Sequence, residues 1–281
     1  MQSDRSLVIP ARAAAMPEAR DGSVTEAQVY AAIAAVLDPE LDESLLKLGF
    51  IDRVEVNGPD VTVVFKLPTY WCAPNFAYLM ASDLRASAYQ VPGVRSARVV
   101  LLDHCAEEEI TAGINAGRSF GEAFEAETPG DADLEQLRRT FLRKGFLMRQ
   151  DTLLRRMLKA GLDEEIIAAL HVADLSADED SDEAFVATPG GVIRLQGAGR
   201  GASGYLRKRR ALGLSQIADA PLITDDSGQP LAPGGLADFL RRSRSVRLNI
   251  MFNTAMCKSL FRTRYQGAGA EEAHRDEGDD I

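Results

Sequence analysis

Cysteines, aromatic residues and long apolar runs are all scarce in this sequence. With only three cysteines in 281 residues, the chain has no disulfide framework, and a reducing compartment such as the cytoplasm is expected. No apolar run approaches the roughly 20 residues that a membrane-spanning helix requires. Near the N-terminus, the apolar stretch Leu7-Val8-Ile9 is too short for a secretory signal. We therefore expect no contact with a membrane.

Apolar residues make up 46% of the chain, which is enough to build a core in one large domain or two small ones. Changes in composition divide the chain into six segments: a disordered leader at 1–23, an α+β domain at 24–124, a helical segment at 131–175, an acidic linker at 176–191, a basic, mixed or helical region at 192–266, and a disordered acidic tail at 267–281.

The charge is distributed unevenly along the chain. The net charge is −10, yet residues 192–266 hold 13 basic and 4 acidic side chains, a local excess of positive charge. Such a region docks on the acidic remainder of the chain or stays solvated, or else it binds nucleic acid or another anionic partner. We favour the first two alternatives, because charge runs are most often solvated faces, and we do not expect nucleic acid as a partner.

In the first domain, hydrophobic periodicity predicts the order helix, strand, strand, helix, strand. Thr25 is a candidate N-cap for the first helix. Two alternating runs on either side of Asn57-Gly58-Pro59-Asp60 predict a β-hairpin. A second helix is expected at 75–91 and a third strand at 94–103. The fold class is therefore α+β, with helices on one face of a short sheet, followed by a mainly helical extension.

Most of the extension is predicted to be helical. Helical patterns fill 131–175, with Gly145 and Gly161 as natural C-caps, and 236–265 has the same periodicity. The sequence Gly199-x-Gly201-x-x-Gly204 fits a dinucleotide-binding fingerprint. The helix after it is too basic for a Rossmann unit, so we expect a flexible loop and no nucleotide site there.

Cys72 is the first candidate functional residue. It follows the second predicted strand, and Pro74 is expected to begin the next helix, so Cys72 lies at or just before a helix N-terminus. Unpaired N–H groups and the helix dipole favour a thiolate there. A thiolate is the ligand that soft metals and iron–sulfur clusters require. The alternative is a small buried residue, the commonest fate of a free cysteine.

His104 and Cys105 come at the end of the third predicted strand. As neighbours on a strand, their side chains would face opposite ways, so both point at one metal only if the strand ends at Asp103. If the second and third strands end side by side, Cys72 and Cys105 can meet, with His104 as a third ligand. The spacing matches neither a zinc finger nor a ferredoxin.

We expect no functional role for Cys257, His171 and His274. Cys257 lies on an apolar helical stripe and is expected to pack in a core. His171 ends a predicted helix and His274 is in the tail. The sequence therefore offers no credible Ser-His-Asp triad, and hydrolytic catalysis would have no obvious general base.

Several of these features occur together in a recognisable order. The acidic turn Asp38-Pro39-Glu40, the Leu48-Gly49 lead into a strand, and Cys72 beside Ala73-Pro74 resemble the iron–sulfur assembly domain of the SufT and PaaD type. The resemblance implies that Cys72 is the reactive cysteine, and that Asp38 and Glu40 shape or polarise its site. Two positions depart from the pattern: Ala73 separates the cysteine from proline, and His104-Cys105 stand where the family often has proline–tryptophan.

The resemblance implies an accessory protein rather than an enzyme: a metallocluster maturation factor. Iron or an iron–sulfur cluster would be held transiently at Cys72, with Cys105 and His104 as auxiliary metal ligands. The assembly machinery and a client metalloenzyme, such as a multicomponent oxygenase, would be its partners. One cysteine cannot fill four coordination positions, so a homodimer or a small thiol would complete a cluster site.

Two other classes stay open alongside the maturation factor. One is a client-specific adaptor or chaperone that binds apo-enzyme and handles no metal. The other is a nucleotide-binding oxidoreductase that uses the glycine-rich sequence.

Overall fold

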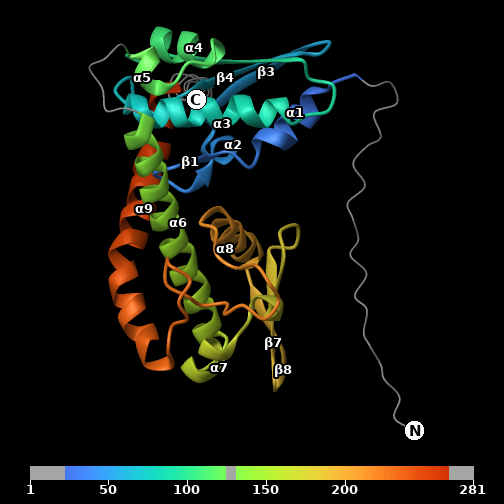
Figure 1. Ribbon diagram of the computed structural model, residues 1–281, viewed down its shortest axis with the longest axis vertical. Coiled ribbons are helices and arrows are strands. Elements are labelled where there is room, and N and C mark those ends of the chain that lie inside the picture. Colours follow the sequence, from blue (N-terminus) through green and yellow to red (C-terminus); the bar gives the residue numbers. More distant parts are fainter. Residues whose placement is uncertain (1–22, 125–130, 266–281) are drawn as a thin grey trace, which may run out of the picture.

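The computed structural model describes residues 23–124 and 131–265. In Figure 1, an N-terminal α+β domain lies at one end, and two long helices, α6 (Asp131–Lys159) and α9 (Leu236–Tyr265), run side by side away from it. A smaller group of elements around α8 (Gly199–Ala211) packs beside α6. The predicted leader, apart from Ser23, and the predicted tail lie outside the described residues.

The N-terminal domain has the predicted order of elements, and its α+β class is confirmed. The main elements are α1 (Glu26–Ile33), β3 (Ile51–Asn57), β4 (Asp60–Lys66), α3 (Pro74–Tyr89) and β5 (Ser96–Leu102). Between α1 and β3 lie two short paired strands and one helical turn: β1 (Leu37–Asp38), β2 (Glu43–Ser44) and α2 (Leu45–Leu48). The domain ends with α4 (Glu107–Asn115) and α5 (Phe120–Ala123).

Local sequence accounts for the first helix and the hairpin. Thr25 Oγ1 accepts from the N–H of Gln28 at 3.3 Å, and the Gln28 side chain accepts from the N–H of Thr25 at 2.9 Å. This reciprocal capping box satisfies donors that the first turn of a helix leaves unpaired. At the hairpin, Asn57 pairs with Asp60, and Gly58 has φ +61°, which favours glycine.

The three-stranded sheet brings two loops together at one end of its strands. Its central strand, β4, is antiparallel to β3 and parallel to β5. Alternate side chains of β4 and β5 are buried on the face covered by α3: Val61, Val63, Phe65, Ala97, Val99 and Leu101. Because β4 and β5 are parallel, with Lys66 opposite Leu102, the loops that follow them leave the sheet at the same end.

Helix α4 covers the free edge of β5. Asn115 Oδ1 accepts from the N–H of Val99 at 2.9 Å, and Asn115 Nδ2 donates to the Val99 carbonyl at 2.7 Å. Thr111 Oγ1 accepts from the N–H of Leu101 at 3.2 Å. These side chains satisfy backbone groups that an open edge would offer to another chain.

The C-terminal region is mainly helical, as predicted, and contains a second small sheet. After α6 come α7 (Glu164–Ala169), a short 3₁₀ helix η1 (Val172–Asp174), and the antiparallel strands β6 (Leu175–Asp178), β7 (Glu183–Thr188) and β8 (Gly191–Gln196). Helix α8 and the 3₁₀ helix η2 (Pro233–Gly235) then lead into α9. No helix among the described residues is long and apolar enough to cross a membrane.

Helix α6 differs from the prediction of separate helices. Gly145, expected as a C-cap, lies inside one continuous helix. A Cβ at Gly145 would lie 2.9 Å from Oδ1 of Asp42. Gly145 therefore does not mark the end of a helix. A glycine is found there because the turn after β1 packs closely against α6.

Two segments predicted to lack regular structure are ordered. The expected linker at 176–191 forms parts of β6 and β8 and all of β7. The expected loop at 199–204 forms the beginning of α8. A Cβ at Gly199 would lie 2.0 Å from the Asp178 carbonyl oxygen, and one at Gly204 would lie 2.0 Å from Nη1 of Arg149. Close packing thus accounts for both glycines.

The basic region packs on the acidic remainder of the chain. Its ion pairs with acidic residues outside the region are Lys208–Asp42, Arg247–Asp151, Arg200–Asp182, Arg207–Glu179 and Arg194–Glu183. Docking within the chain, the first alternative for the excess of positive charge, is therefore confirmed.

The buried side chains form two clusters, and α9 joins both. The first cluster comes from the N-terminal domain together with Phe261 of α9, whereas the second extends from Phe146 to Phe239. Buried Asp151 of α6 accepts from Ser243 Oγ of α9 at 2.8 Å. The last turns of α9 thus belong to the core of a domain that ends in sequence near residue 124.

Candidate functional site

Cys72 lies in the loop between β4 and α3, immediately before the start of α3. Ala73 is the N-cap of α3 and Pro74 is its first residue, as the sequence predicts for this loop. The N–H of Cys72 donates to the Thr69 carbonyl at 3.4 Å, and the Cys72 thiol is 3.3 Å from Thr69 Oγ1. The cysteine is half-buried against the domain core. Its neighbours Tyr70 and Trp71 are exposed, Trp71 by 77%.

The loop after β5 is tied directly to the Cys72 loop. The N–H of Cys105 donates to the Tyr70 carbonyl at 3.0 Å, and His104 Nε2 lies 2.7 Å from the Cys72 carbonyl. His104 Nδ1 accepts from the N–H of Ala106 at 3.1 Å. A carbonyl can only accept, so Nε2 carries the proton and the ring is a neutral tautomer. Burial lowers the pKa of His104, in agreement with that state.

His104 therefore differs from the ligand that the sequence suggested. Both of its ring nitrogens are engaged by the main chain, and neither offers a lone pair to a metal. Its side chain is buried and holds the carbonyl of Cys72 in place. Cys105 is exposed on the same loop. The two sulfur-bearing loops are thus brought together as expected, with the histidine as the tie between them.

We predict that His104→Phe will lower the free energy of unfolding by about 1–3 kcal/mol, because a carbonyl and an N–H would lose their buried partner. The loop would also loosen, so Cys72 would react faster with an alkylating reagent. Chemical denaturation and timed thiol labelling would measure the two effects. His171→Gln, at a half-exposed histidine of a distant loop, should leave both unchanged; an equal effect there would contradict a specific role for His104.

The acidic turn Asp38-Pro39-Glu40 lies in the same domain, with Asp38 buried and Glu40 half-buried. Asp38 Oδ1 accepts from the N–H groups of Glu40 and Leu41, at 2.8 and 3.0 Å. Burial raises the pKa of Asp38 to about 6, against the opposing effect of these two hydrogen bonds. The carboxyl group of Asp38 is thus a buried acceptor that forms the turn.

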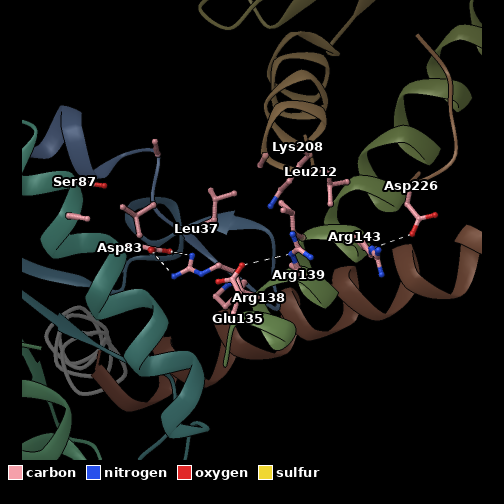
Figure 2. A pocket seen from close by; sticks show the side chains of 16 residues that line it. Leu37, Asp83, Ser87, Glu135, Arg138, Arg139, Arg143, Lys208, Leu212 and Asp226 are labelled. Atoms are coloured by element: carbon pink, nitrogen blue, oxygen red, sulfur yellow. Dashed lines mark hydrogen bonds and ion pairs between the residues drawn. The ribbon is translucent and has the colours of Figure 1, made fainter. Parts of the chain in front are cut away.

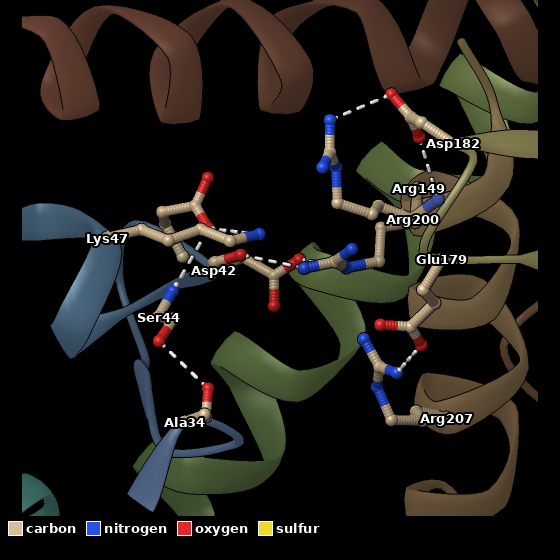
Figure 3. Close-up of polar contacts among 10 residues, drawn as sticks. Ala34, Asp42, Ser44, Lys47, Arg149, Glu179, Asp182, Arg200 and Arg207 are labelled. Carbon is tan, nitrogen blue, oxygen red and sulfur yellow. Dashed lines mark hydrogen bonds and ion pairs between the residues drawn. The ribbon is translucent and has the colours of Figure 1, made fainter. Parts of the chain in front are cut away.

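The position of this turn depends on the C-terminal region. Asp42, at φ +52°, is almost fully buried. Its carboxylate contacts Arg149 Nε of α6 at 2.5 Å and Lys208 Nζ of α8 at 2.5 Å. Figure 3 shows Arg149 reaching Asp42 beside the Ser44–Ala34 hydrogen bond that closes the turn. Two helices from outside the domain therefore hold the turn that carries Asp38 and Glu40.

Helix α9 covers the same side of the domain. Asn253 Nδ2 donates to Glu40 Oε1 at 3.4 Å, and the ring of Phe261 lies 5.1 Å from that of Phe50. Arg264 donates to the carbonyls of Leu67, at 3.3 Å, and Asp103, at 2.8 Å. These two carbonyls belong to the loops after β4 and β5. The end of α9 thus spans the acidic turn and both loops of the candidate site.

A cavity of about 620 Å³ borders the acidic turn at Leu37 and Pro39 but is not lined by Cys72. The cavity lies between α3, α6 and α8, and Figure 2 shows the charged side chains that line it. Arg138 forms a bidentate pair with Asp83, at 2.7 and 2.9 Å, and Arg143 pairs with Asp226 at 3.4 Å. Its acidic and basic side chains are largely paired, and none of the predicted site residues lines it.

Part of the N-terminal domain is similar to a known family. Residues 26–100 match the family model described as iron-sulfur cluster assembly protein. The match runs from α1 into β5 and supports a general role in iron–sulfur cluster assembly, which confirms the predicted resemblance. We call residues 24–124 the assembly domain. No curated protein and no solved structure matches the chain.

The match contains Asp38, Glu40 and Cys72 and ends before His104 and Cys105. Within the described residues, no group of three or more cysteine, histidine, aspartate or glutamate side chains is placed to hold a metal ion. The assembly domain thus offers thiols suited to iron, but not a complete set of ligands.

Cys257 lies on α9, outside the assembly domain in sequence. It does pack against a core, as predicted, but that core belongs to the assembly domain. Burial raises the pKa of the Cys257 thiol to about 11, and the Coulombic effect of Asp38 adds to it. Its helical stripe revealed burial, but nothing in the pattern indicated which core it joins.

Proposed function

We propose that this protein is a maturation factor that carries iron or an iron–sulfur cluster at Cys72 and delivers it to a client metalloenzyme. The support is the position of Cys72: half-buried, one residue before the N-cap of α3, and inside the segment that matches the assembly family. Negative charge is favoured near the N-terminus of a helix, and a thiolate is the form that binds iron.

Delivery would occur by ligand exchange. The sulfur of Cys72 bonds the metal, and a thiolate or carboxylate of the client then replaces it, so that one bond forms as one breaks and no electron changes hands. His104 would fix the Cys72 backbone, and Cys105 would serve as the auxiliary ligand from the adjoining loop. Asp38 and Glu40 would shape the site from the acidic turn. A second copy of the chain or a small thiol would complete the coordination of a cluster.

The exposed residues beside Cys72 would contact the client. Tyr70 and Trp71 stack edge to face, with ring centroids 4.8 Å apart, and both are exposed. Exposed aromatic residues are enriched at protein interfaces. The resemblance makes a component of a multicomponent oxygenase the proposed class of client, with the cytoplasm as the compartment and the iron–sulfur assembly machinery as the source of the metal.

The second candidate function is a client-specific adaptor that handles no metal. It is favoured by a row of exposed apolar side chains on α9: Leu248, Met251, Phe252, Met256 and Leu260. Contiguous exposed apolar side chains mark interaction surfaces. In this reading the helix would bind apo-enzyme, and Cys72 would be a packing residue only.

Anaerobic reconstitution with ferrous iron and sulfide separates the two functions. The wild-type chain should gain the visible absorbance of thiolate-bound iron and retain iron after desalting, and Cys72→Ser should retain iron only at background level, because the bonding sulfur is gone. Cys105→Ser, at the exposed auxiliary position, should retain part of it. If Cys72→Ser binds as much iron as the wild type, the carrier function fails and the adaptor stands.

A further inference from the structure

The outer side of α9 carries a row of exposed apolar side chains. Helix α6 packs against one side of α9, and in Figure 1 the opposite side of α9 forms an edge of the molecule. Five large apolar side chains on this helix are 40–67% exposed: Leu248, Met251, Phe252, Met256 and Leu260. At 1.5 Å per residue, the row extends for about 18 Å along the helix. Contiguous exposed apolar side chains mark an interaction surface.

A hollow of about 460 Å³ borders this row. It lies between α9, α6 and the turn that joins β1 to β2, and its apolar lining is Leu41, Met148, Ile250, Met251 and Ala255. Met251 belongs to both the row and the hollow, and we call the two together the α9 surface. A ridge beside a hollow is a shape that accepts an amphipathic helix, whose apolar side chains enter at helical spacing.

Methionines are concentrated on the α9 surface. Three of the seven in the chain belong to it: Met148, Met251 and Met256. The unbranched, polarisable side chain of methionine adapts to the shape of an apolar partner and is common at protein-binding surfaces. The composition of the surface therefore fits a protein partner.

The free charges beside the α9 surface are positive. Arg244 and Lys258 lie seven residues before and after Met251, so they share its side of the helix, and Arg262 follows the row. None of these three forms an ion pair among the residues that the structure describes. The acidic side chains that line the hollow already have partners, since Asp42 pairs with two basic residues and Glu43 with one. The surface is thus complementary to negative charge.

Three other occupants match this surface less well. Two copies of it would meet with like charges, because an antiparallel pair brings the end that carries Arg244 to the end that carries Arg262. The tail of the chain, 267–281, is acidic, but Ile281 is its only large apolar residue. A lipid surface would lie across the hollow without entering it. An acidic helix supplies both the opposite charge and the side chains that fill the hollow.

We propose that the α9 surface binds an acidic amphipathic helix of a partner protein. The apolar face of that helix would cover Phe252 and enter the hollow, and its carboxylates would pair with the free basic side chains. Neither Cys72 nor Cys105 lines the hollow. The proposal therefore goes beyond the carrier function and does not depend on iron binding.

A fluorescent synthetic peptide tests the surface directly. The probe is a helix of roughly 18 residues with leucines on one face and glutamates and alanines on the other, and the control peptide has lysine in place of every glutamate. Fluorescence anisotropy with the full chain, without iron, should show saturable binding of the acidic peptide that weakens with added salt. The lysine peptide should bind at least about tenfold more weakly. Equal binding of the two peptides, or no binding of the acidic one, would overturn the proposal.

Phe252→Asp should weaken binding of the acidic peptide at least about tenfold, because a central apolar contact is replaced by a like charge. Lys258→Glu should also weaken it. Ile217→Asp is the matched control, since Ile217 is 69% exposed against 67% for Phe252 and lies outside the α9 surface. Thermal unfolding checks that the variants are folded, and Met256→Gln serves as a milder second variant. Wild-type affinity in folded Phe252→Asp, or an equal loss in Ile217→Asp, would refute a specific surface.

Two further measurements address the other occupants. If the chain binds phosphatidylglycerol vesicles through Phe252 but does not bind the peptide, the surface belongs to a membrane and the proposal fails. If sedimentation shows a wild-type dimer that Phe252→Asp dissociates, the occupant is a second copy and the proposal also fails.

The iron reconstitution experiment keeps this inference separate from the proposed function. Phe252→Asp should retain as much iron as the wild type. Absence of peptide binding together with iron retention that depends on Cys72 would reject the α9 surface alone. Peptide binding that depends on Phe252, together with iron retention in Cys72→Ser, would reject the carrier alone.

Discussion

Replacing Asp42 with asparagine should lower the free energy of unfolding by about 3–5 kcal/mol, the typical effect of breaking a buried ion pair from one side. Arg149 and Lys208, whose side chains are 15% and 12% exposed, would remain buried without their counter-charge. Asparagine tolerates the left-handed backbone that Asp42 adopts at φ +52°, so the change isolates the charge. Urea denaturation of the full chain would measure the loss.

The neighbouring residue provides the matched control for Asp42. Glu43 pairs with Lys47 at 3.7 Å, and the lysine side chain is 58% exposed. Glu43→Gln should therefore change stability by no more than about 0.5 kcal/mol, since exposed ion pairs contribute little. Equal effects of the two variants would refute the view that α6 and α8 hold the acidic turn through Asp42.

The Asp38 carboxyl group should make the wild-type chain less stable as the pH rises from about 4 to about 6. Its pKa is raised by burial from 3.8 to about 6 in the folded chain, so the folded state binds the proton more tightly than the unfolded state. Protonated Asp38 therefore favours folding below pH 4, and this contribution is lost by pH 6. The shift corresponds to about 3 kcal/mol.

Asp38→Asn should remove this pH dependence, because an amide does not titrate and its oxygen still accepts from Glu40 and Leu41. The stability difference between the variant and the wild type, from urea denaturation at pH 4.5, 5.5 and 7.5, should grow in favour of the variant. Asp182→Asn is a control that should show no pH dependence in this range, since hydrogen bonding from the Arg200 N–H lowers the pKa of Asp182 below 3.8 and the group stays ionised in both states. Parallel curves for wild type and Asp38→Asn would contradict the prediction.

Elements formed by neighbouring residues could be predicted from the sequence. Thr25 caps the first helix through a residue three positions away, the Asn57–Asp60 turn closes a hairpin between adjacent strands, and Pro74 begins α3. Each depends on backbone geometry and side-chain chemistry within a few residues. The position of Cys72 just before a helix could be predicted in the same way, because Pro74 marks the helix start.

Segments whose conformation depends on distant partners could not be predicted. Gly145 was predicted to end a helix because glycine is common at helix C-termini. It lies instead in the middle of α6, where Asp42 leaves no room for a side chain. His104 looked like a metal ligand, but the carbonyl of Cys72 and the N–H of Ala106 engage both of its nitrogens. Neither contact has a signature in the local sequence.

By itself, the sequence determined the α+β order of the assembly domain, the family it resembles and the cysteine before α3, because caps, turns and periodicity act over short stretches of chain. Only the tertiary structure decided that α9 returns to this domain and packs Cys257 against its core. That return depends on the packing of Phe261 on Phe50 and on hydrogen bonds from Arg264 to two loops. Such contacts join residues far apart in the chain, so patterns within a short stretch of sequence do not reveal them.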